Sequence, residues 1–322
     1  MSAPRVAIVG ARRVRQGLGP YVARDLIAAG AQVPCFLATS EASREAARRE
    51  LRETLGIEAR GHTDLDAMLA GERLDALAIL SPAATHARYL DAAANHGLHV
   101  LCEKPFVWGE PDLPGRTRAL LAAFAKRQLV VFENCQWPHT LAAFEALHPG
   151  ALAAPPRRFE MQLEPQSRGL DSLGDALPHA VSLLQVLVPG ERARVERVDY
   201  STRDPGADAL SVRFHYRTEL HACEAVVHLQ RRDAPPRNAS YSLDGRRARR
   251  LVSPRGYRLC FADADRSVPV ADPLTQLVAD FVAALTALAG TPQGTASPAA
   301  CIQQRMQIVS ALVSAYASQE IR

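Results

Sequence analysis

Short apolar runs alternate with segments of helical spacing along the first part of the chain. The runs have the length and composition of buried strands, and the segments between them have the length of helices. The predicted strands are Arg5–Gly10, Gln32–Ala38, Leu74–Leu80, His99–Cys102 and Leu129–Glu133. The predicted helices are Pro20–Ala29, Ser43–Leu55, Asp64–Leu69, His86–Asn95 and Arg116–Arg127. This alternation predicts βαβ units, and therefore a doubly wound α/β domain with a parallel sheet over residues 1–138.

Residues 139–322 follow a different pattern, in which apolar and polar residues alternate one by one. Such alternation is typical of half-buried antiparallel strands. The predicted strands are Arg157–Glu164, Ala193–Ser201, Ala209–Arg217, His221–Gln230, Asn238–Gly245 and Arg255–Ala262. The predicted helices are His139–Leu147, Asp175–Leu187, Leu274–Leu288 and Pro298–Ala317. A second α/β domain, with a large and mainly antiparallel sheet, is therefore expected after residue 138.

Composition narrows the function classes. The 322-residue chain is 48% hydrophobic and has a formal charge of only +4, which favours a globular protein that binds no nucleic acid. No apolar stretch reaches the roughly 20 residues that span a bilayer, and the chain starts without a signal-like segment, so we expect a cytoplasmic location and no membrane partner. Its six cysteines form no closely spaced pair, so neither a metal site nor a disulfide framework is expected. The densest basic cluster is interpreted as a solvated strand face and comprises Arg246, Arg247, Arg249 and Arg250.

A glycine-rich loop follows the first predicted strand. Gly10, Gly17 and Gly19 lie between this strand and the first helix, where backbone amides and the helix dipole bind a dinucleotide pyrophosphate. The loop is longer than the common dinucleotide fingerprint and carries the cations Arg12, Arg13 and Arg15. A glycine-rich turn that binds no ligand accounts for these residues equally well.

The end of the second predicted strand lacks the acid that binds the ribose hydroxyls of NAD. Thr39 and Ser40 stand there, and Arg44 follows. Hydroxyl and guanidinium groups suit a 2′-phosphate, so NADP is favoured over NAD. Alternatively, Arg44 belongs to a ladder of ion pairs on the helix surface.

The tripeptide Glu103-Lys104-Pro105 lies at the carboxyl end of a predicted buried strand. Open α/β sheets bind their ligands at that edge. The tripeptide is therefore a candidate site, although a solvated charged loop is the simpler interpretation when it is taken alone.

Three stretches together resemble the Gfo/Idh/MocA family, the group of glucose-fructose oxidoreductase and inositol dehydrogenase. The block Leu74–Pro105 is similar to the family's strand, Ser-Pro turn, His-bearing helix and Glu-Lys-Pro strand. Asp175–His179 resembles its Asp-x-x-x-His helix, and Asp272–Leu285 resembles its return helix. The resemblance implies a Rossmann domain followed by a domain with an open-faced sheet.

The resemblance also implies roles for individual residues. Lys104 would bind the reacting oxygen, His179 would act as general acid/base, and Asp175 would bind substrate or orient the site. The expected cofactor contacts, beyond the glycine loop and the residues after the second strand, are Ser81, Pro82, His86, Glu103 and Lys104. His86 is equally well explained as a helix cap. Asn134 and Gln136 are expected near the substrate, whereas Trp137 is interpreted as packing.

The chain departs from the family pattern on the substrate side. Leu170 and Asp171 replace a glycine pair, and Ser182 replaces an aspartate. We therefore expect an NAD(P)-dependent oxidoreductase that transfers a hydride between nicotinamide and a small polar carbonyl, alcohol or imine, sugar-like or unusual. The alternative is a non-enzymatic dinucleotide-binding sensor. An open-faced sheet usually pairs with another subunit, so a homodimer or homotetramer is expected.

Overall fold

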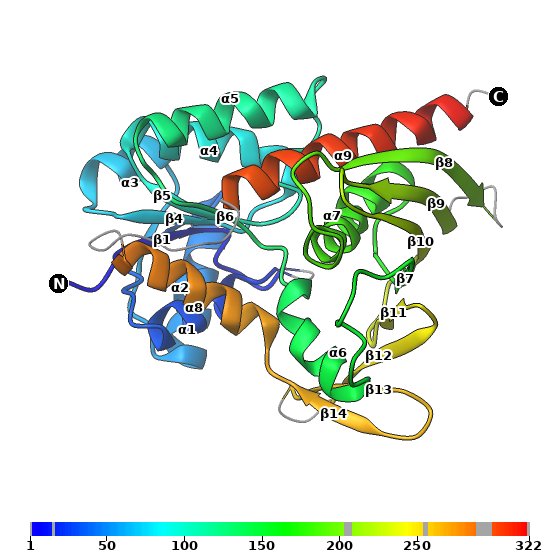
Figure 1. Ribbon diagram of the computed structural model, residues 1–322. Helices are drawn as coiled ribbons and strands as arrows, with labels where there is room; N and C mark the ends of the chain where they lie inside the picture. The colour runs from blue at the N-terminus through cyan, green and yellow to red at the C-terminus, as the bar shows by residue number, and fades with distance from the viewer. Residues whose placement is uncertain (1, 15–16, 203–207, 254–256, 288–297, 321–322) are drawn as a thin grey trace. The chain divides into compact units, whose positions relative to one another are not determined.

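Two units that each have their own core make up the chain. The computed structural model describes residues 2–14, 17–202, 208–253, 257–287 and 298–320 (Figure 1). The first unit comprises residues 1–134 and 274–303, and the second comprises residues 135–273 and 304–322.

The first unit is built on a six-stranded parallel sheet with strand order β3-β2-β1-β4-β5-β6. This order is that of dinucleotide-binding α/β folds, so the predicted doubly wound domain is confirmed. Its strands are β1 (Val6–Val9), β2 (Cys35–Leu37), β3 (Arg60–His62), β4 (Ala76–Ile79), β5 (His99–Cys102) and β6 (Val131–Glu133). Its helices are α1 (Gly19–Ala28), α2 (Glu41–Leu55), α3 (Leu65–Gly71), η1 (Ala83–Thr85), α4 (His86–His96) and α5 (Leu113–Lys126), to which α8 (Pro273–Ala287) adds residues from 274 onward.

Local sequence signals account for the ends of these helices. The Ser40 hydroxyl accepts a hydrogen bond from the Ser43 amide at the start of α2, and Gly56 ends that helix in the left-handed conformation. The edge strand β3 has no apolar run, and for that reason the periodicity did not predict it. It forms because its backbone pairs with β2.

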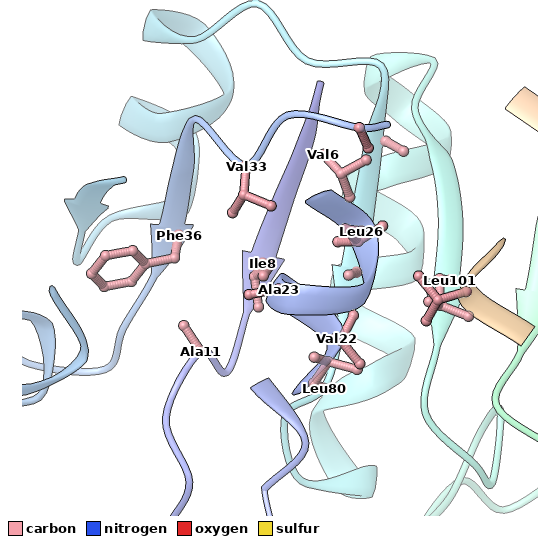
Figure 2. Packing of buried hydrophobic residues seen from close by; sticks show 14 of the residues in the cluster. Val6, Ile8, Ala11, Val22, Ala23, Leu26, Val33, Phe36, Leu80 and Leu101 are labelled. Carbon is pink, nitrogen blue, oxygen red and sulfur yellow. The ribbon is translucent and has the colours of Figure 1, made fainter. Parts of the chain in front are cut away.

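Helix α8 differs from the sequence-based assignment to the second domain. Its residues Leu277, Val278 and Phe281 belong to the buried cluster of the first unit, together with residues such as Val6 and Ile8 of β1 (Figure 2). The ring of Phe281 also lies 5.6 Å from that of Phe132 on β6, in an edge-to-face arrangement. The apolar face of α8 therefore returns to a core formed by residues far earlier in the chain.

The second unit contains an eight-stranded, mainly antiparallel sheet with order β14-β13-β12-β11-β7-β10-β9-β8. Only β7 and β10 pair in parallel. Its strands are β7 (Arg158–Leu163), β8 (Arg194–Thr202), β9 (Ala209–Arg217), β10 (Ala222–Gln230), β11 (Ala239–Leu243), β12 (Arg246–Val252), β13 (Leu259–Ala262) and β14 (Ser267–Val270). Its helical segments are η2 (Trp137–Thr140), α6 (Leu141–Leu147), α7 (Gly169–Leu187) and the part of α9 (Pro298–Glu320) from residue 304 onward. The predicted mainly antiparallel sheet is thus confirmed, with two strands beyond the six predicted ones, β14 and also β12, which the sequence indicated only through its basic cluster.

Aromatic packing joins the start of the second unit to its sheet. The ring of Tyr241 on β11 stacks on Phe144 of α6 at 4.8 Å. It also meets the rings of Trp137 and Phe261 edge to face, at 5.9 and 5.6 Å. These contacts hold η2 against the same face of the sheet that α6 and α7 contact. Among the described residues, no helix has the length and apolarity to cross a membrane.

Candidate functional site

Two glycines shape the loop between β1 and α1. Gly10 has a φ of +93°, and a Cβ atom there would lie 2.8 Å from the carbonyl oxygen of Leu80. At Gly19, a Cβ atom would lie 2.4 Å from the carbonyl carbon of Ala11. Contacts this short are excluded, so the loop must present bare backbone at the start of a helix. That surface fits the pyrophosphate of a dinucleotide.

The arginines of this loop have different surroundings. Arg12 Nε is buried and has no hydrogen-bond partner. A buried donor without an acceptor is unfavourable, so this group suits an anionic ligand in the loop. The Arg13 guanidinium lies 4.7 Å from the ring centroid of Tyr21, and the Gly17 amide donates to the Val14 carbonyl at 3.0 Å. Arg15 lies outside the described residues.

At the end of β2, the structure supports the simpler interpretation of Arg44. Its guanidinium pairs with Glu41 at 2.6 Å on the surface of α2, and the Ser40 hydroxyl caps that helix. Thr39 is exposed just before the cap. No acid stands at Thr39 or Ser40, the positions that follow β2, in agreement with the sequence.

His86 connects the turns at Ser81 and Pro105, two candidate cofactor contacts, from inside the first unit. It is 0% exposed, with Nδ1 2.9 Å from the Pro105 carbonyl oxygen and Nε2 2.9 Å from that of Ser81. Burial lowers the pKa of its imidazole, and the two carbonyl groups only partly oppose this effect. A side chain without exposure cannot contact a ligand from solvent, so His86 supports the site by positioning these turns. Pro82, beside Ser81, precedes η1 and accepts from the Thr85 hydroxyl at 2.7 Å.

The Glu103-Lys104-Pro105 turn leaves the end of β5 and is held on both sides. The Glu103 amide donates to the Ile79 carbonyl at 2.8 Å, and the Asn134 side-chain amide donates to the Glu103 carboxylate. The Lys104–Pro105 peptide bond is cis. Residues on β4 and β6 therefore set the position of Lys104.

Two buried polar residues at the end of β6, Glu133 and Asn134, support this turn. Glu133, 6% exposed, accepts a hydrogen bond from the Phe106 amide at 2.8 Å. Asn134 is 2% exposed, and its Oδ1 atom is buried without a hydrogen-bond partner. Asn134 was predicted near the substrate; its structural contact is with Glu103, and its carbonyl oxygen remains available to a donor.

The predicted substrate-side residues other than Asn134 lie in the second unit. Asp175 and His179 are both half-buried and lie one turn apart on α7. The His179 ring meets that of Trp137 edge to face at 6.2 Å, and its carbonyl oxygen accepts from the Ser182 hydroxyl at 2.8 Å. Gln136 is half-buried at the start of η2. Trp137 is 5% exposed and packs as expected.

One arginine of the basic cluster is placed differently from the sequence interpretation. Arg247 and Arg249 lie on an exposed strand face, as predicted, but the Arg250 guanidinium lies 5.6 Å from the Trp137 ring centroid. Its position two residues after the buried Ala248 was the available signal, because alternate residues of a strand share a face. Arg237, just before β11, was likewise not identified as a site residue.

Among the described residues, the potential metal ligands that lie together are Cys35, His62 and Glu72. Glu72 already accepts from Arg60 at 3.0 Å and faces His62 at 3.0 Å. Burial raises the pKa of the Cys35 thiol to about 12. The cluster is therefore satisfied by hydrogen bonds and an ion pair, and we assign it no role in the site.

Comparison with known proteins gives a match for the first unit. Residues 4–135 match the Gfo/Idh/MocA family model, described as an oxidoreductase family with an NAD-binding Rossmann fold. This part of the chain is therefore similar to the dinucleotide-binding domain of that family. The glycine loop, the Arg12 donor and the turn at Lys104 all lie within the matched segment.

Individual relatives extend the picture. D-apiose dehydrogenase of Paraburkholderia graminis is 36% identical over 110 residues, which are 33% of this chain and 28% of the relative. The NADP(+)-named scyllo-inositol 2-dehydrogenase of Bacillus subtilis (strain 168) is 33% identical over 129 residues, which are 40% of this chain and 36% of the relative. The chain thus matches about a third of the length of these two dehydrogenases.

A solved structure shares the fold over nearly the whole chain. It is a UDP-N-acetylglucosamine 3-dehydrogenase from Acidithiobacillus ferrooxidans, with a TM-score of 0.68 and 20% identity. The likeness covers 98% of this chain and 99% of that chain. Both units therefore have the architecture of known members of the fold.

The buried His86 predicts a pH effect on stability. Its folded-state pKa lies below the ordinary value of 6.5, so the unfolded chain takes up a proton that the folded chain resists. Stability is then fully present above pH 6.5 and is lost as the pH falls below it. His99, whose pKa is also lowered by burial, acts with the same sign. We expect His86→Gln to flatten the fall in the free energy of unfolding between neutral and acidic pH, as measured by urea denaturation.

The matched control is His96→Gln, which alters an exposed histidine in the last turn of α4. It should leave the pH dependence unchanged. An equal slope in the His86→Gln variant and the natural protein would show that His86 is already protonated in the fold.

Proposed function

We propose that the chain is an NAD(P)-dependent oxidoreductase that transfers a hydride between nicotinamide and a small polar carbonyl or alcohol. The observation that carries this proposal is the connection between the glycine loop and the Lys104 turn within the first unit. Gly10 lies against Leu80, and the next residue, Ser81, is joined through His86 to Pro105. A surface for a pyrophosphate and an ammonium group are thereby held on one rigid scaffold, as pre-organised catalysis requires.

Three side chains are proposed to carry the chemistry. The nicotinamide, when bound, supplies or accepts the hydride. The Lys104 ammonium would stabilise negative charge on the substrate oxygen, and the His179 imidazole would exchange the proton. Asp175, one turn before His179, would bind the substrate or orient the histidine.

The substrate is proposed to be polyhydroxylated. The relatives are named for D-apiose, scyllo-inositol and UDP-N-acetylglucosamine, which all carry several hydroxyl groups. The half-buried polar residues Gln136, Asp175 and His179 are groups that can form hydrogen bonds with such a molecule. The replacement of the family aspartate by Ser182, whose hydroxyl is used within α7, favours a substrate outside the standard inositol type.

A second candidate is a non-enzymatic sensor that binds NAD(P) without turnover. The same glycine loop would serve it, but a sensor has no need of Lys104, Asp175 and His179 together. Tight dinucleotide binding without nicotinamide oxidation or reduction, across a panel of aldoses, polyols and their acids, would favour the sensor.

Replacement of Lys104 tests the enzymatic proposal. Lys104→Ala is expected to lower kcat by at least about 100-fold, because the cation at the developing alkoxide is lost. The Kd for the dinucleotide should change little. Steady-state absorbance of the reduced nicotinamide measures the first quantity, and fluorescence titration measures the second.

Lys126→Ala is the control, since it removes the other lysine of the sequence, which is exposed at the end of α5. Its kcat should equal that of the natural protein. Full turnover in Lys104→Ala would refute the assigned mechanism.

We further propose a preference for NADP over NAD. Hydrogen-bond donors for a 2′-phosphate are available from Arg12 and Arg13 and from the hydroxyls of Thr39 and Ser40. Thr39 and Ser40, which follow β2, place no carboxylate where it would repel that phosphate. The ion pair of Arg44 with Glu41 weakens the contribution of that arginine, so the preference rests mainly on the others.

The Thr39→Asp substitution tests this preference. An acid at that position would favour the free ribose hydroxyls of NADH and repel the 2′-phosphate of NADPH. The ratio of Kd for NADH to Kd for NADPH should exceed one in the natural protein and fall by at least about tenfold in the variant, a change of about 1.4 kcal/mol. Thr54→Asp, which adds the same charge at the far, exposed end of α2, should leave the ratio unchanged. Tighter binding of NADH than of NADPH by the natural protein would contradict the proposal.

We also propose that the protein forms a homodimer or homotetramer through the polar face of the eight-stranded sheet. This face carries cross-strand ion pairs such as Arg213 with Glu224 at 2.9 Å and Arg247 with Glu160 at 2.7 Å. Alternating acidic and basic groups can complement themselves across a two-fold axis.

Sedimentation equilibrium tests the oligomer. The natural protein should have at least twice the chain mass of 34.9 kDa. Arg213→Glu, which places two acids side by side on this face, should shift the mass toward the monomer. Arg48→Glu, which disrupts an exposed ion pair on α2 instead, should not. A natural protein of monomer mass would rule the oligomer out.

A further inference from the structure

Two arginines of the second unit lie on the side of the sheet that faces α7 rather than on its polar face. Arg250 belongs to β12, and Arg237 precedes β11. In the β11–β12 pair, Ala239 is opposite Arg250 and the buried Tyr241 is opposite Ala248. Because paired residues share a face, Arg250 projects on the side of Tyr241, whereas the neighbouring Arg249 projects on the side of Ser240.

The Arg250 guanidinium has fewer partners than its chemistry requires. Its Nη2 atom donates to the Arg237 carbonyl oxygen at 3.2 Å, and its centre lies 5.6 Å from the ring centroid of Trp137. Its Nε atom is buried and has no hydrogen-bond partner. The Arg237 cation disfavours the charge on Arg250, whereas Tyr257 favours that charge only when its phenol is ionised. Burial lowers the pKa of the guanidinium, which shows that its surroundings disfavour the cation.

Arg237 has the same deficiency beside the predicted substrate residues. Its Nε atom donates to the Arg232 carbonyl oxygen at 3.1 Å, while its Nη2 atom is buried without a partner. The carboxylates that favour its charge are Asp175, Asp233 and Glu164. Asp175 is one turn from His179 on α7, so the Arg237 charge acts on the part of the unit assigned to substrate.

Trp137 connects Arg250 to that helix. Its ring meets His179 at 6.2 Å and the Arg250 guanidinium at 5.6 Å. The Arg250 cation, with its unused buried Nε donor, therefore lies against this ring next to a proposed acid/base residue, and Arg237 adjoins it through the Arg250–Arg237 hydrogen bond. Buried cations normally have anionic partners, because removal from water is otherwise costly.

We propose that Arg237 and Arg250 bind an anionic group, a carboxylate or a phosphate, on the substrate of this enzyme. The unused Arg237 Nη2 and Arg250 Nε atoms donate to its oxygens, and the guanidinium planes match the planar or tetrahedral arrangement of those oxygens. The substrate class is then an acidic polyhydroxylated compound, either a sugar acid or a sugar phosphate. The binding of an anion by these arginines does not depend on the proposed function. Only the statement that the anion belongs to the substrate rests on it.

A structural role for Arg250 is the competing explanation. A guanidinium on an indole ring stabilises a fold by about 0.5 to 2 kcal/mol without any ligand. That role predicts a loss of stability on substitution and no selective binding of anions. The two explanations therefore differ in a binding measurement.

The test uses the fluorescence of Trp137. The sequence has two tryptophans, so the full chain with Trp108→Phe reports on Trp137 alone. This protein is titrated with D-glucuronate, D-glucose 6-phosphate and neutral D-glucose at constant ionic strength. We expect saturable changes with one or both anions and a Kd for D-glucose at least about tenfold weaker. The two anions separate a carboxylate site from a phosphate site.

Substitutions then locate the site. Arg250→Met and Arg237→Met, made in the same background, should each weaken anion binding by at least about tenfold. Arg249→Met is the matched control, since it removes a neighbouring arginine that projects from the opposite face of β12, and it should bind anions as tightly as its parent. Arg250→Lys keeps a cation near Trp137 but loses the guanidinium fork, so it should fold and still bind weakly. This variant gives the answer if Arg250→Met does not fold.

The outcomes separate this inference from the proposed function. Selective anion binding that depends on Arg250, without turnover of any acid or phosphate in the presence of NADPH, would support the anion site and contradict the dehydrogenase. Turnover of neutral sugars with no preference for anions would support the dehydrogenase and overturn the anion site. Equal Kd values for D-glucose and both anions, or anion binding unchanged in Arg250→Met and Arg237→Met, would likewise overturn it.

Discussion

The contacts of one buried imidazole hold together the two turns of the candidate site in the first unit. His86 joins the carbonyl groups of Ser81 and Pro105 at 2.9 Å each, and so ties the end of β4 to the turn after β5. Gly10 meets the first of these segments, and Lys104 immediately precedes Pro105. A neutral imidazole has a single N–H group, so the protonation state of His86 decides which of the two carbonyl oxygens accepts a hydrogen bond from it. The position of the proposed catalytic lysine thus depends on a histidine that is itself fully buried.

The two faces of the eight-stranded sheet carry charged side chains in different surroundings. On the polar face, arginines and acids pair across neighbouring strands, as Arg213 does with Glu224. On the opposite face, Arg250 lies against Trp137 with a buried Nε donor and no such acid. Ion pairs in water contribute little, whereas an incompletely paired cation away from water is unfavourable. That asymmetry indicates a ligand on the face toward α7, and the exposed pairs give no such indication.

Much of the framework followed from sequence pattern, and its failures have physical causes. The run at β5 and the i, i+4 spacing of Asp175 and His179 are local signals, and both lie in the predicted elements. Helix α8 was assigned to the wrong unit, because an amphipathic pattern shows that a face is buried but not which core buries it. The sequence could not decide whether His86 contacts the cofactor or caps its helix, because the hydrogen-bond partners of His86 lie 5 and 19 residues away in other turns.

The sequence by itself determined the fold class of the first unit. A parallel α/β domain, a glycine loop and a lysine at a strand end are consequences of short-range patterns, and the residues that carry them lie in the segment that matches a family model with an NAD-binding Rossmann fold. The tertiary structure decided which side chains are buried together. Arg250 belongs to a run of arginines interrupted only by Ala248, and the pairing of β12 with β11 places it on the side of Trp137. Burial and unsatisfied hydrogen-bonding groups arise from residues distant in the chain, so no local pattern could have specified them.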